Sequence, residues 1–509
     1  MKAKYSPFTS RLALLLAGAV LGALPLNAQE PWREGRNIAG LSLYDANTLE
    51  ARVGGRFTSG EYRLPSEAAQ LWQAGTNAQA ESHFKDMLFV GAFSFEVQHA
   101  KDMMGSMFCY PGFYPIDVLE FTPGPKTRQT YNIGGGLAWT GSPHWAAGFN
   151  LDFKGINYSK RKDLRHTTYR QEMSFVPSVV YKGKGWNAGA SFILEKNSEF
   201  IQAEQLGTAT AATYYAFLDK GKRFGTYQIW DGSGIHLTDF GVDRLAVNQL
   251  SWGGALQASW GNRLYADAEF KFSYGEVGEK GYTWFRFPGV RFETKVLGYI
   301  PGNDGMHALR ADAASALVEN FESVIDQVSA GGVTTPVEYG SNRIYVQAST
   351  QTGVSYTYES HQGWDVSTSA QIVWTEDRGT HMYPYLAYDA STMLNLAVQG
   401  HLPLGPVTLE AGMSFREELA EDHEIVETDE TNVGVVSYPV RLHDWWFVEE
   451  EYNDTRRLGV NLNIRYDFTI ARRHRLFVEA GCSWWHIFEA FVLTGKDRQT
   501  TQLTLGYNF

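Results

Sequence analysis

The sequence predicts an all-β protein: a transmembrane antiparallel β-barrel of eighteen strands, with short periplasmic turns and long extracellular loops. Three observations support this prediction. The chain begins with an export signal, its middle repeats segments in which apolar and polar residues alternate, and its last strand ends on an aromatic residue. Beyond the leader no apolar stretch approaches the length of a membrane helix, so any membrane span must be formed by strands.

The first residues have the pattern of a secretory leader. Lys2, Lys4 and Arg11 are positive, the apolar run 12–24 is too short to cross a membrane, and a cleavage site follows at Ala28. We therefore expect a cleaved signal peptide rather than an anchor helix. The expected organisation is a signal peptide over 1–28, a periplasmic N-terminal segment over 29–48 and a barrel over 49–509.

Several segments alternate clearly between apolar and charged residues. Over Arg263–Tyr274, for example, Leu264, Phe270 and Phe272 share one face and the charged residues share the other. In a membrane barrel the apolar face meets lipid and the charged face lines the lumen. The lumen-facing candidates are Asp152, Lys154, Arg263, Asp267, Glu269, Lys271, Arg343, Arg465 and Asp467. Their mixed signs fit either a polar solute path or ion pairs that brace the wall.

Short and long connections alternate along the chain, as they do in outer-membrane barrels. Counted back from a periplasmic Phe509, every short turn falls on the periplasmic side. The tryptophans that flank these turns, as an interfacial aromatic girdle would, are Trp139, Trp145, Trp186, Trp260 and Trp364. Sixteen strands are an alternative, because the segments near 49, 76 and 306 alternate weakly. The expected strands start near 49, 76, 87, 128, 144, 166, 186, 246, 263, 283, 306, 342, 364, 388, 407, 455, 476 and 498.

The C-terminal stretch alternates up to its final residue. Leu505, Tyr507 and Phe509 share one face, which resembles the signal that barrel-assembly machinery reads. We therefore expect the cell outer membrane as the location, with membrane lipid, lipopolysaccharide and the assembly machinery as partners.

Composition and motifs exclude several functions. The net charge is −12, or about −15 without the three positive charges of the leader, which argues against nucleic acid as a partner. The two cysteines, Cys109 and Cys482, have no metal-site spacing and are poorly placed to form a disulfide. No hydrolase, metalloprotease or phosphate-loop motif occurs. We expect no enzymatic activity, no metal site and no cofactor.

Three long connections are candidates for function. The acidic stretch Glu417–Glu430 lacks the spacing of a calcium loop, so we expect a solvated loop. Trp445, Trp446 and Phe447 are adjacent aromatics that would tuck into the barrel mouth, the membrane interface or a partner protein. The segment 198–245 is longer than a plain connection needs, and it would either constrict the lumen or cap the barrel.

The layout resembles a family of uncharacterised outer-membrane β-barrel proteins from Bacteroidota. Gln129–Trp139 (QTYNIGGGLAW), Lys162–Glu172 (KDLRHTTYRQE) and the C-terminal strand carry the resemblance. It departs at Leu164, where that family often has proline. The resemblance implies a compartment and a fold, and it supplies no substrate and no catalytic residues.

Three functional hypotheses follow. The first is a channel or transporter for an unidentified solute, which the size and polarity of the lumen favour. The second is an accessory barrel that docks a lipoprotein, a TonB-dependent transporter or a secretion component through its long loops. The third, an outer-membrane enzyme, requires an acid–base pair near the mouth that the sequence does not reveal.

Overall fold

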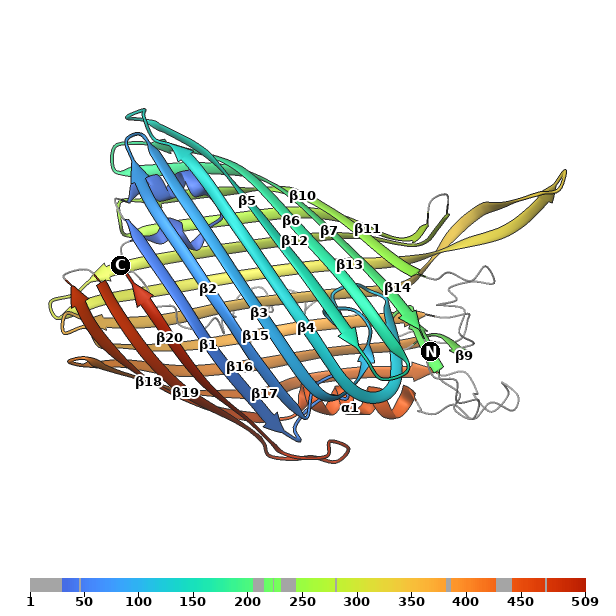
Figure 1. Cartoon of the computed structure of the whole chain (residues 1–509). Coiled ribbons are helices and arrows are strands. Elements are labelled where there is room, and N and C mark those ends of the chain that lie inside the picture. Colours follow the sequence, from blue (N-terminus) through green and yellow to red (C-terminus); the bar gives the residue numbers. More distant parts are fainter. Residues whose placement is uncertain are drawn as a thin grey trace, which may run out of the picture.

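The computed structural model describes residues 30–44, 47–204, 215–222, 224–229, 244–279, 282–380, 386–426, 442–471 and 474–509. Eighteen of its strands close into one antiparallel barrel (Figure 1). The first half of the wall comprises β1 (Thr48–Gly60), β2 (Gln70–Phe84), β3 (Met87–Ser106), β4 (Asp117–Trp139), β5 (Trp145–Lys160), β6 (Arg165–Lys182), β7 (Trp186–Glu204), β10 (Arg244–Trp260) and β11 (Leu264–Glu279). The second half comprises β12 (Tyr282–Pro301), β13 (Gly305–Ala330), β14 (Val333–Ser360), β15 (Asp365–Thr380), β16 (Leu386–Leu404), β17 (Val407–Val426), β18 (Arg457–Ala471), β19 (His474–Ile487) and β20 (Asp497–Asn508).

Each wall strand pairs with the next along the chain, and β20 pairs with β1 to close the ring. In the ring, β7 is followed by β10, and these two strands pair directly with each other. The intervening β8 (Tyr215–Asp219) and β9 (Gly225–Ile229) form a hairpin that pairs with the first residues of β4. The prediction of eighteen strands is confirmed, and the sixteen-strand alternative is wrong because the three weak segments form β1, β2 and β13.

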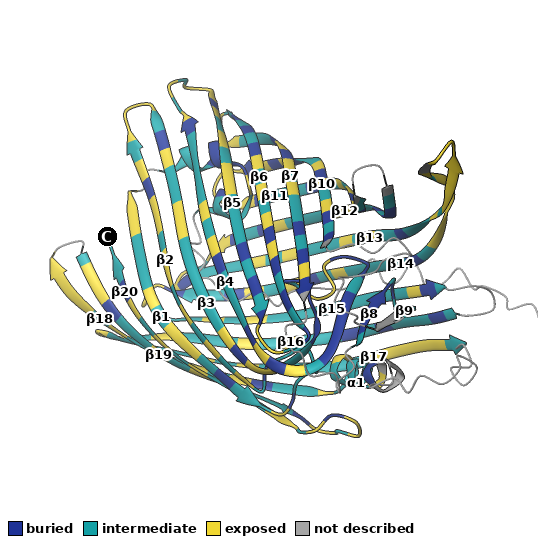
Figure 2. Ribbon diagram, turned by 45° about the vertical axis from the view of Figure 1, so that its right-hand side comes forward, coloured by how far each residue is buried: buried dark blue, intermediate teal, exposed yellow. Residues whose placement is uncertain are grey.

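The outer face of the wall is apolar. In β11, Leu264, Phe270, Phe272 and Tyr274 are 40–48% exposed, whereas Tyr265, one position away from Leu264, is completely buried on the lumenal side. Exposed and covered residues alternate in the same way along much of the wall (Figure 2). Such alternation places apolar side chains where lipid would meet them and polar ones in the lumen. The exposed tryptophans at one end of the wall are Trp139, Trp145, Trp186 and Trp260.

The two ends of the barrel differ. One end, called the turn end, carries short connections such as 85–86, 183–185 and 261–263, together with the last residue of the chain. The other, called the loop end, carries the long connections and the helix α1 (Leu442–Asp454) (Figure 1). The hairpin of β13 and β14 protrudes beyond the barrel at the loop end. Among the described helices, none is long and apolar enough to cross a membrane.

One expected loop is a strand. The acidic stretch that begins at Glu417 continues β17 as far as Val426 and pairs there with β16. Its charged residues reach solvent from a strand that extends past the barrel rim, which is why their composition resembled that of a loop. Residues 427–430 of the same stretch lie outside the described part of the chain.

Two apolar clusters fill part of the lumen, one at each end. At the turn end, the short 3-10 helices η2 (Pro31–Glu34) and η3 (Ile38–Leu43) bury Trp32 and Ala39 against wall strands. At the loop end, residues 107–116, which join β3 to β4, bury Met107, Phe108 and Tyr114 against the wall. Below, residues 30–44 are called the plug and residues 107–116 the inner loop. The sequence analysis did not predict that either segment lies inside the barrel.

Candidate functional site

The plug spans the lumen through two neighbouring charged residues. Arg33 forms an ion pair with Glu81 on β2. Glu34 pairs with Lys295 on β12 at 3.2 Å and with Arg310 on β13 at 3.2 Å. Because β2 and β13 are nine steps apart in a ring of 18 strands, they lie on opposite sides of the barrel. The plug is therefore fastened across the full width of the lumen.

Further polar contacts hold the middle of the plug. Arg36 pairs with Glu195 on β7 and lies 3.4 Å from Glu269 on β11. Burial opposes the charged form of Arg36, yet Glu269 and Glu195 raise its pKa above the usual value. The Asn37 amide donates to the carbonyl of Val179 at 3.2 Å and to Gln257 at 3.1 Å. The plug thus uses side chains from the same polar wall that the sequence predicts.

Apolar contacts and glycines complete the fit of the plug. Trp32 is 1% exposed, packs edge-on against Tyr265 with ring centroids 5.5 Å apart, and donates from Nε1 to Ser259 at 3.0 Å. A Cβ atom at Gly189 of β7 would lie 2.6 Å from Asn37 Nδ2 and 2.8 Å from the Trp32 ring. A Cβ atom at Gly136 of β4 would overlap Ile38. The wall therefore has glycine residues at positions that the plug approaches closely.

The inner loop is fastened by β6 and β7. Thr168 donates from its hydroxyl to the carbonyl of Met107 at 2.7 Å. The backbone N–H of Cys109 donates to Glu199 at 2.6 Å, and Glu199 also pairs with Arg170 at 2.9 Å. The Arg170 guanidinium lies 3.8 Å from the centre of the Phe113 ring. This buried charge pair and its aromatic neighbour hold the inner loop against the wall.

A second buried charged group lies where β4 enters the barrel. Glu120 is completely buried between two lysines, with Lys126 at 3.1 Å and Lys160 at 2.5 Å. Lys126 also donates to the carbonyl of Ser106 at 3.0 Å. Buried charges are stable only with partners of this kind, so the group fixes the inward course of β4.

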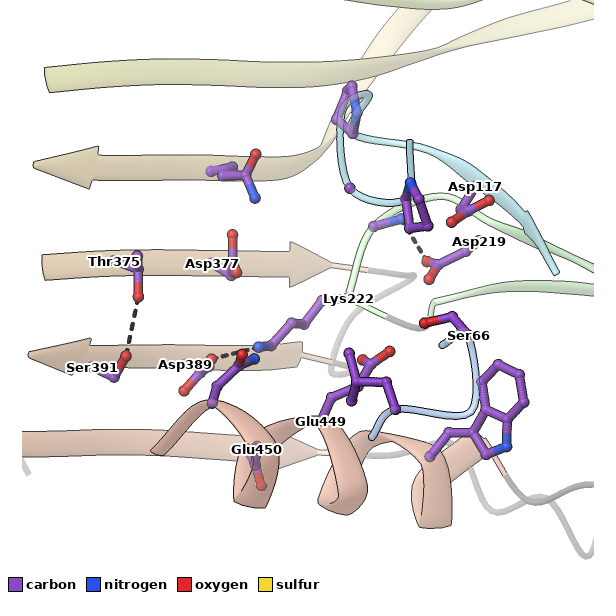
Figure 3. Close-up of a pocket in the computed structure, with 18 of the residues that line it drawn as sticks. Ser66, Asp117, Asp219, Lys222, Thr375, Asp377, Asp389, Ser391, Glu449 and Glu450 are labelled. Carbon is purple, nitrogen blue, oxygen red and sulfur yellow. Dashed lines mark hydrogen bonds and ion pairs between the residues drawn. The ribbon is translucent and has the colours of Figure 1, made fainter. Parts of the chain in front are cut away.

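A cavity of about 610 Å³ remains at the loop end. It is enclosed by the inner loop, the β8–β9 hairpin, strands β14 to β17 and α1 (Figure 3). Aromatic side chains contribute to its lining, namely Tyr114, Tyr345 and Trp445. Its basic lining residues are Lys222 and Arg416, and its acidic ones are Asp117, Asp219, Asp377, Asp389, Glu449, Glu450 and Asp454. Acidic side chains therefore dominate the charge of this cavity.

Burial and neighbouring carboxylates raise the pKa of two carboxyl groups in this lining. On α1, burial and the nearby Asp389 raise the pKa of Glu450 to about 7. Burial, Glu418 and Asp389 likewise raise the pKa of Asp454 to about 7. At the cavity rim, Glu418, Glu421 and Asp454 have carboxylate oxygens within 4.8 Å of one another. Ionised carboxylates this close repel one another, and a bound cation would reduce that repulsion.

The structure brings most of the predicted lumenal residues to the plug, the inner loop or each other. Glu269 and Lys271 form an ion pair at 3.0 Å, and Asp267 accepts from Tyr265 at 3.1 Å. Lys154 lies over the ring of Tyr110 in the inner loop at 4.7 Å, and Asp152 lies near Arg36.

The remaining predicted lumenal residues lie apart from these two segments. Arg465 pairs with Asp467 at 2.8 Å on β18, and Arg343 pairs with Glu319 at 2.8 Å. Arg263 lies in the turn between β10 and β11, because β11 begins only at Leu264. These residues form local contacts in the wall or its turns.

The aromatic patch is divided by the structure. Trp445 is 6% exposed and packs edge-on against Phe121, with ring centroids 5.4 Å apart, so it anchors α1 to the barrel. Phe447 is exposed, while the side chain of Trp446 lies outside the described part of the structure. At the C-terminus, Leu505 and Phe509 are exposed on the outer face, and Tyr507 lies 2.5 Å from His474.

The plug and the acidic lining of the cavity escaped the sequence analysis. Asp377 and Asp389 stand on wall strands, where one more polar residue among many is not distinctive. The plug carried a weak signal: the run Trp32-Arg33-Glu34 combines an aromatic with both charges just before the first strand. The three glycines at 134–136 were a second signal, because strand interiors normally contain few glycines.

Comparisons with known proteins give low similarity to solved structures and assign no activity. No curated protein matches it. A FadL homologue of Pseudomonas aeruginosa is 11% identical, with a TM-score of 0.31 over 94% of this chain and 94% of that chain. The ferric preacinetobactin receptor BauA of Acinetobacter baumannii is 7% identical, with a TM-score of 0.42 over 92% and 80%. P. aeruginosa FpvA, in complex with heterologous pyoverdines, is 9% identical, with a TM-score of 0.41 over 91% and 72%.

These likenesses describe the fold alone. The sequence itself gives a firmer relation, because one family model covers the whole barrel and residues 38–44 of the plug. That model describes a family of unknown function, DUF6850, and it matches residues 38–509, so the chain belongs to this family.

Proposed function

We propose that the protein is an outer-membrane barrel that moves a solute through its lumen, with the plug as its closed gate. The single observation that carries the proposal is the attachment of Arg33 and Glu34 to opposite sides of the ring. A barrel of this size leaves a lumen that its own wall side chains do not fill. A segment that crosses this lumen at one end therefore controls passage through it.

The contacts of the plug suit a gate that opens. The side chains of Arg33, Arg36 and Glu34 keep partial access to solvent in their ion pairs. The pairs of Arg36 and Glu34 each contribute little to stability, so they can exchange with water at small cost. Release of Arg33 costs more, because its partner Glu81 is buried. The buried Trp32 supplies the larger part of the fit, and it would have to leave its pocket beside Tyr265 for the gate to open.

The proposal includes the membrane and its partners. The apolar outer face favours the outer membrane, and the exposed Phe509 at the end of β20 favours recognition by barrel-assembly machinery. Lipopolysaccharide would contact the outer face near the loop end. Origin in Bacteroidota remains a prediction of the resemblance. The proposal assigns no catalytic step to the protein.

Planar-bilayer recordings test the gate. Glu34→Arg places a third positive charge beside Lys295 and Arg310, so we expect it to displace the plug and to raise single-channel conductance well above that of the wild type. Arg456→Gln is the control, because it breaks an exposed pair with Glu417 far from the plug. Equal conductance of wild type, Glu34→Arg and a chain lacking residues 30–44 would disprove the gate.

A second candidate function is the docking of another outer-membrane protein. Beyond the barrel, β13 and β14 continue as a two-stranded ribbon over 323–341. β13 last pairs with β12 at Glu322, and β14 first pairs with β15 at Tyr345, so within the described chain both ribbon edges lack a neighbour. The exposed apolar residues of the ribbon are Val324, Val328, Val337 and Tyr339. Unpaired edges of this kind accept a strand from another chain.

Removal of the ribbon tests docking. A chain in which a two-residue turn replaces residues 324–339 keeps the wall pairing of β13 with β12 and of β14 with β15. If docking occurs there, a protein that co-purifies with the wild type from native outer membranes is lost from the shortened chain. An unchanged set of co-purifying proteins would count against this candidate.

A further inference from the structure

The cavity at the loop end has the size of a small-molecule site and is partly open to solvent. Its volume is about 610 Å³, and pockets that hold small ligands typically measure about 300–1,000 Å³. Wall strands, the inner loop, the β8–β9 hairpin and α1 all contribute to its lining. Several segments of the chain, some of them far apart in sequence, therefore converge on one space.

Several carboxylates of the cavity form no ion pair with a cationic side chain of the described residues. Asp389 pairs with Lys222 at 2.6 Å, but no described cation forms an ion pair with Asp377, Glu450 or Asp454. Glu450 Oε1 and Asp389 Oδ1 are buried and accept no hydrogen bond from the described residues. Leaving such oxygens unsatisfied costs free energy, which a ligand with N–H donors and positive charge would recover.

The carboxylates approach the cavity from different walls. Asp377 stands on β15, where it accepts a hydrogen bond from Tyr345 at 2.7 Å, and Glu450 stands on α1 (Figure 3). A ligand with positive charge at two points can pair with both carboxylates. A single metal ion bound to either residue would leave the other unpaired.

The rest of the lining is apolar or aromatic. Tyr345 and Trp445 present rings, and Val373 and Met393 present aliphatic surface. Aromatic faces attract ammonium groups, and aliphatic surface favours hydrocarbon over a hydrated ion. The lining therefore matches a molecule that combines amines with carbon chains.

We propose that this cavity binds an organic cation with two or more amine groups on an aliphatic chain. The inference rests on the proposed transport function and names the class of solute that the barrel takes. Ammonium groups of the ligand pair with Asp377 and Glu450, and its methylene groups pack against Val373, Met393 and the aromatic rings.

A divalent metal ion is the competing occupant. Glu418, Glu421 and Asp454 could offer it three oxygens at the rim, where Glu421 is exposed. Glu418 and Glu421 do not line the cavity, whereas Asp377 and Glu450 do. Substitutions at these two sets of residues therefore separate the two occupants.

Calorimetric titration of the purified protein in detergent tests the proposal. The probe is spermidine at pH 8 and low ionic strength, with triethylene glycol as a neutral chain and calcium chloride as the metal. The cavity variant is Asp377→Asn with Glu450→Gln. The control variant is Asp422→Asn with Glu424→Gln, which removes two exposed charges from β17 outside the cavity. Both variants carry the same lipid, so non-specific binding of spermidine to lipid cancels between them.

We expect saturable binding of spermidine, at least about tenfold weaker in the cavity variant and unchanged in the control. Triethylene glycol should not bind. The proposal is wrong if spermidine does not bind, if the two variants bind it equally, or if calcium displaces it in a manner that Glu421→Gln abolishes. Lost spermidine binding alongside a working gate refutes only the solute class. Normal spermidine binding with a gate that never opens refutes transport and leaves a cation-binding barrel.

Discussion

At the residue scale, the fit of the plug depends on positions where the wall has no side chain. Gly189 is the clearest case, because the three atoms nearest to a Cβ atom there all belong to Asn37 and Trp32 of the plug. Gly298 on β12 is the matched opposite, since a Cβ atom there would meet nothing within 4 Å. The two glycines therefore separate effects on the plug from effects on the strand.

We expect Gly189→Val to push the plug out of its seat while the barrel still folds. Overpacking of this kind costs about 1–3 kcal/mol, which lowers the ratio of the closed to the open state by about 5- to 150-fold. Bilayer conductance checks the result, and trypsin cleavage after Arg33 or Arg36 provides a second measurement. Gly298→Val should behave as the wild type. If both variants gained conductance equally, a general weakening of the wall would be the explanation.

The carboxyl group of Glu450 predicts a pH dependence for α1. Its pKa is about 7, raised by burial and by Asp389, while Lys222 and His423 oppose this shift and Glu421 adds to it. A folded-state pKa above the ordinary value means that the docked helix keeps a proton that the undocked helix loses. Docking is therefore strongest at low pH and weakens as the pH rises through about 7.

Limited proteolysis measures this effect. Chymotrypsin cleavage at the exposed Phe447 of α1 should be faster at pH 8 than at pH 5.5, after correction for the activity of the enzyme on a free peptide. Glu450→Gln should remove part of the difference, because it abolishes one titration and leaves that of Asp454, whose pKa is also about 7. An equal pH dependence in the variant would mean that another group controls the docking of α1.

At the element scale, the two motifs that carry the family resemblance correspond to the two segments inside the barrel. The glycine run of Gln129–Trp139 makes room for Ile38 of the plug at Gly136. The motif Lys162–Glu172 supplies Thr168 and Arg170, which hold the inner loop. Sequence features that look like generic strand residues are therefore explained by what the strands enclose.

Removal of Arg170 should release the inner loop. Arg170→Ala leaves the buried Glu199 carboxylate without its cationic partner, which costs about 3–5 kcal/mol and lowers the thermal midpoint. Arg170→Met with Glu199→Gln removes both charges, so we expect most of the stability to return. Thermal unfolding followed by circular dichroism compares the three proteins. If the double variant were no more stable than Arg170→Ala, the aromatic contact with Phe113 would be the more important one.

The elements of the wall could be predicted because they obey a local rule. The predicted starts near 87, 186 and 407 coincide with β3, β7 and β17, since alternation with period two is visible within each strand. The plug, the inner loop and the β8–β9 hairpin follow no such period. Trp32, for instance, bonds to Ser259, a partner 227 positions away, and one sequence alone carries no record of that contact.

At the scale of the whole molecule, the barrel has an apolar outside and a polar inside, which reverses the arrangement of a soluble protein. Neighbouring residues of β20 test this directly. Leu503 is 55% exposed on the outer face, and Thr504 points to the other side of the sheet. Leu503→Arg should decrease the stability of the barrel folded in lipid vesicles by about 2–4 kcal/mol, whereas Thr504→Arg should decrease it much less. Similar costs at both positions would contradict the assigned orientation.

The fold class could be predicted at this scale, and the acidic cavity could not. Eighteen strands, their sequence order and the alternation of short and long connections follow from the chain itself. The cavity arises only when α1, the inner loop and strands far apart in sequence meet. Asp377 lies on β15 and Glu450 on α1, with β16 and β17 between them in chain order, and nothing local links the two residues.

The plug is joined to the wall by a very short tether. It ends at Tyr44 and β1 begins at Thr48, so a fully stretched link reaches only about 14 Å. β1 also pairs with β20, and this pairing of the first and last strands closes the barrel. The plug can therefore not leave the barrel as a free body: it must peel away from the Trp32 end while it pivots near Tyr44. A force applied to the residues that precede Trp32 would therefore displace the plug first and act on the pairing of β1 with β20 only afterwards.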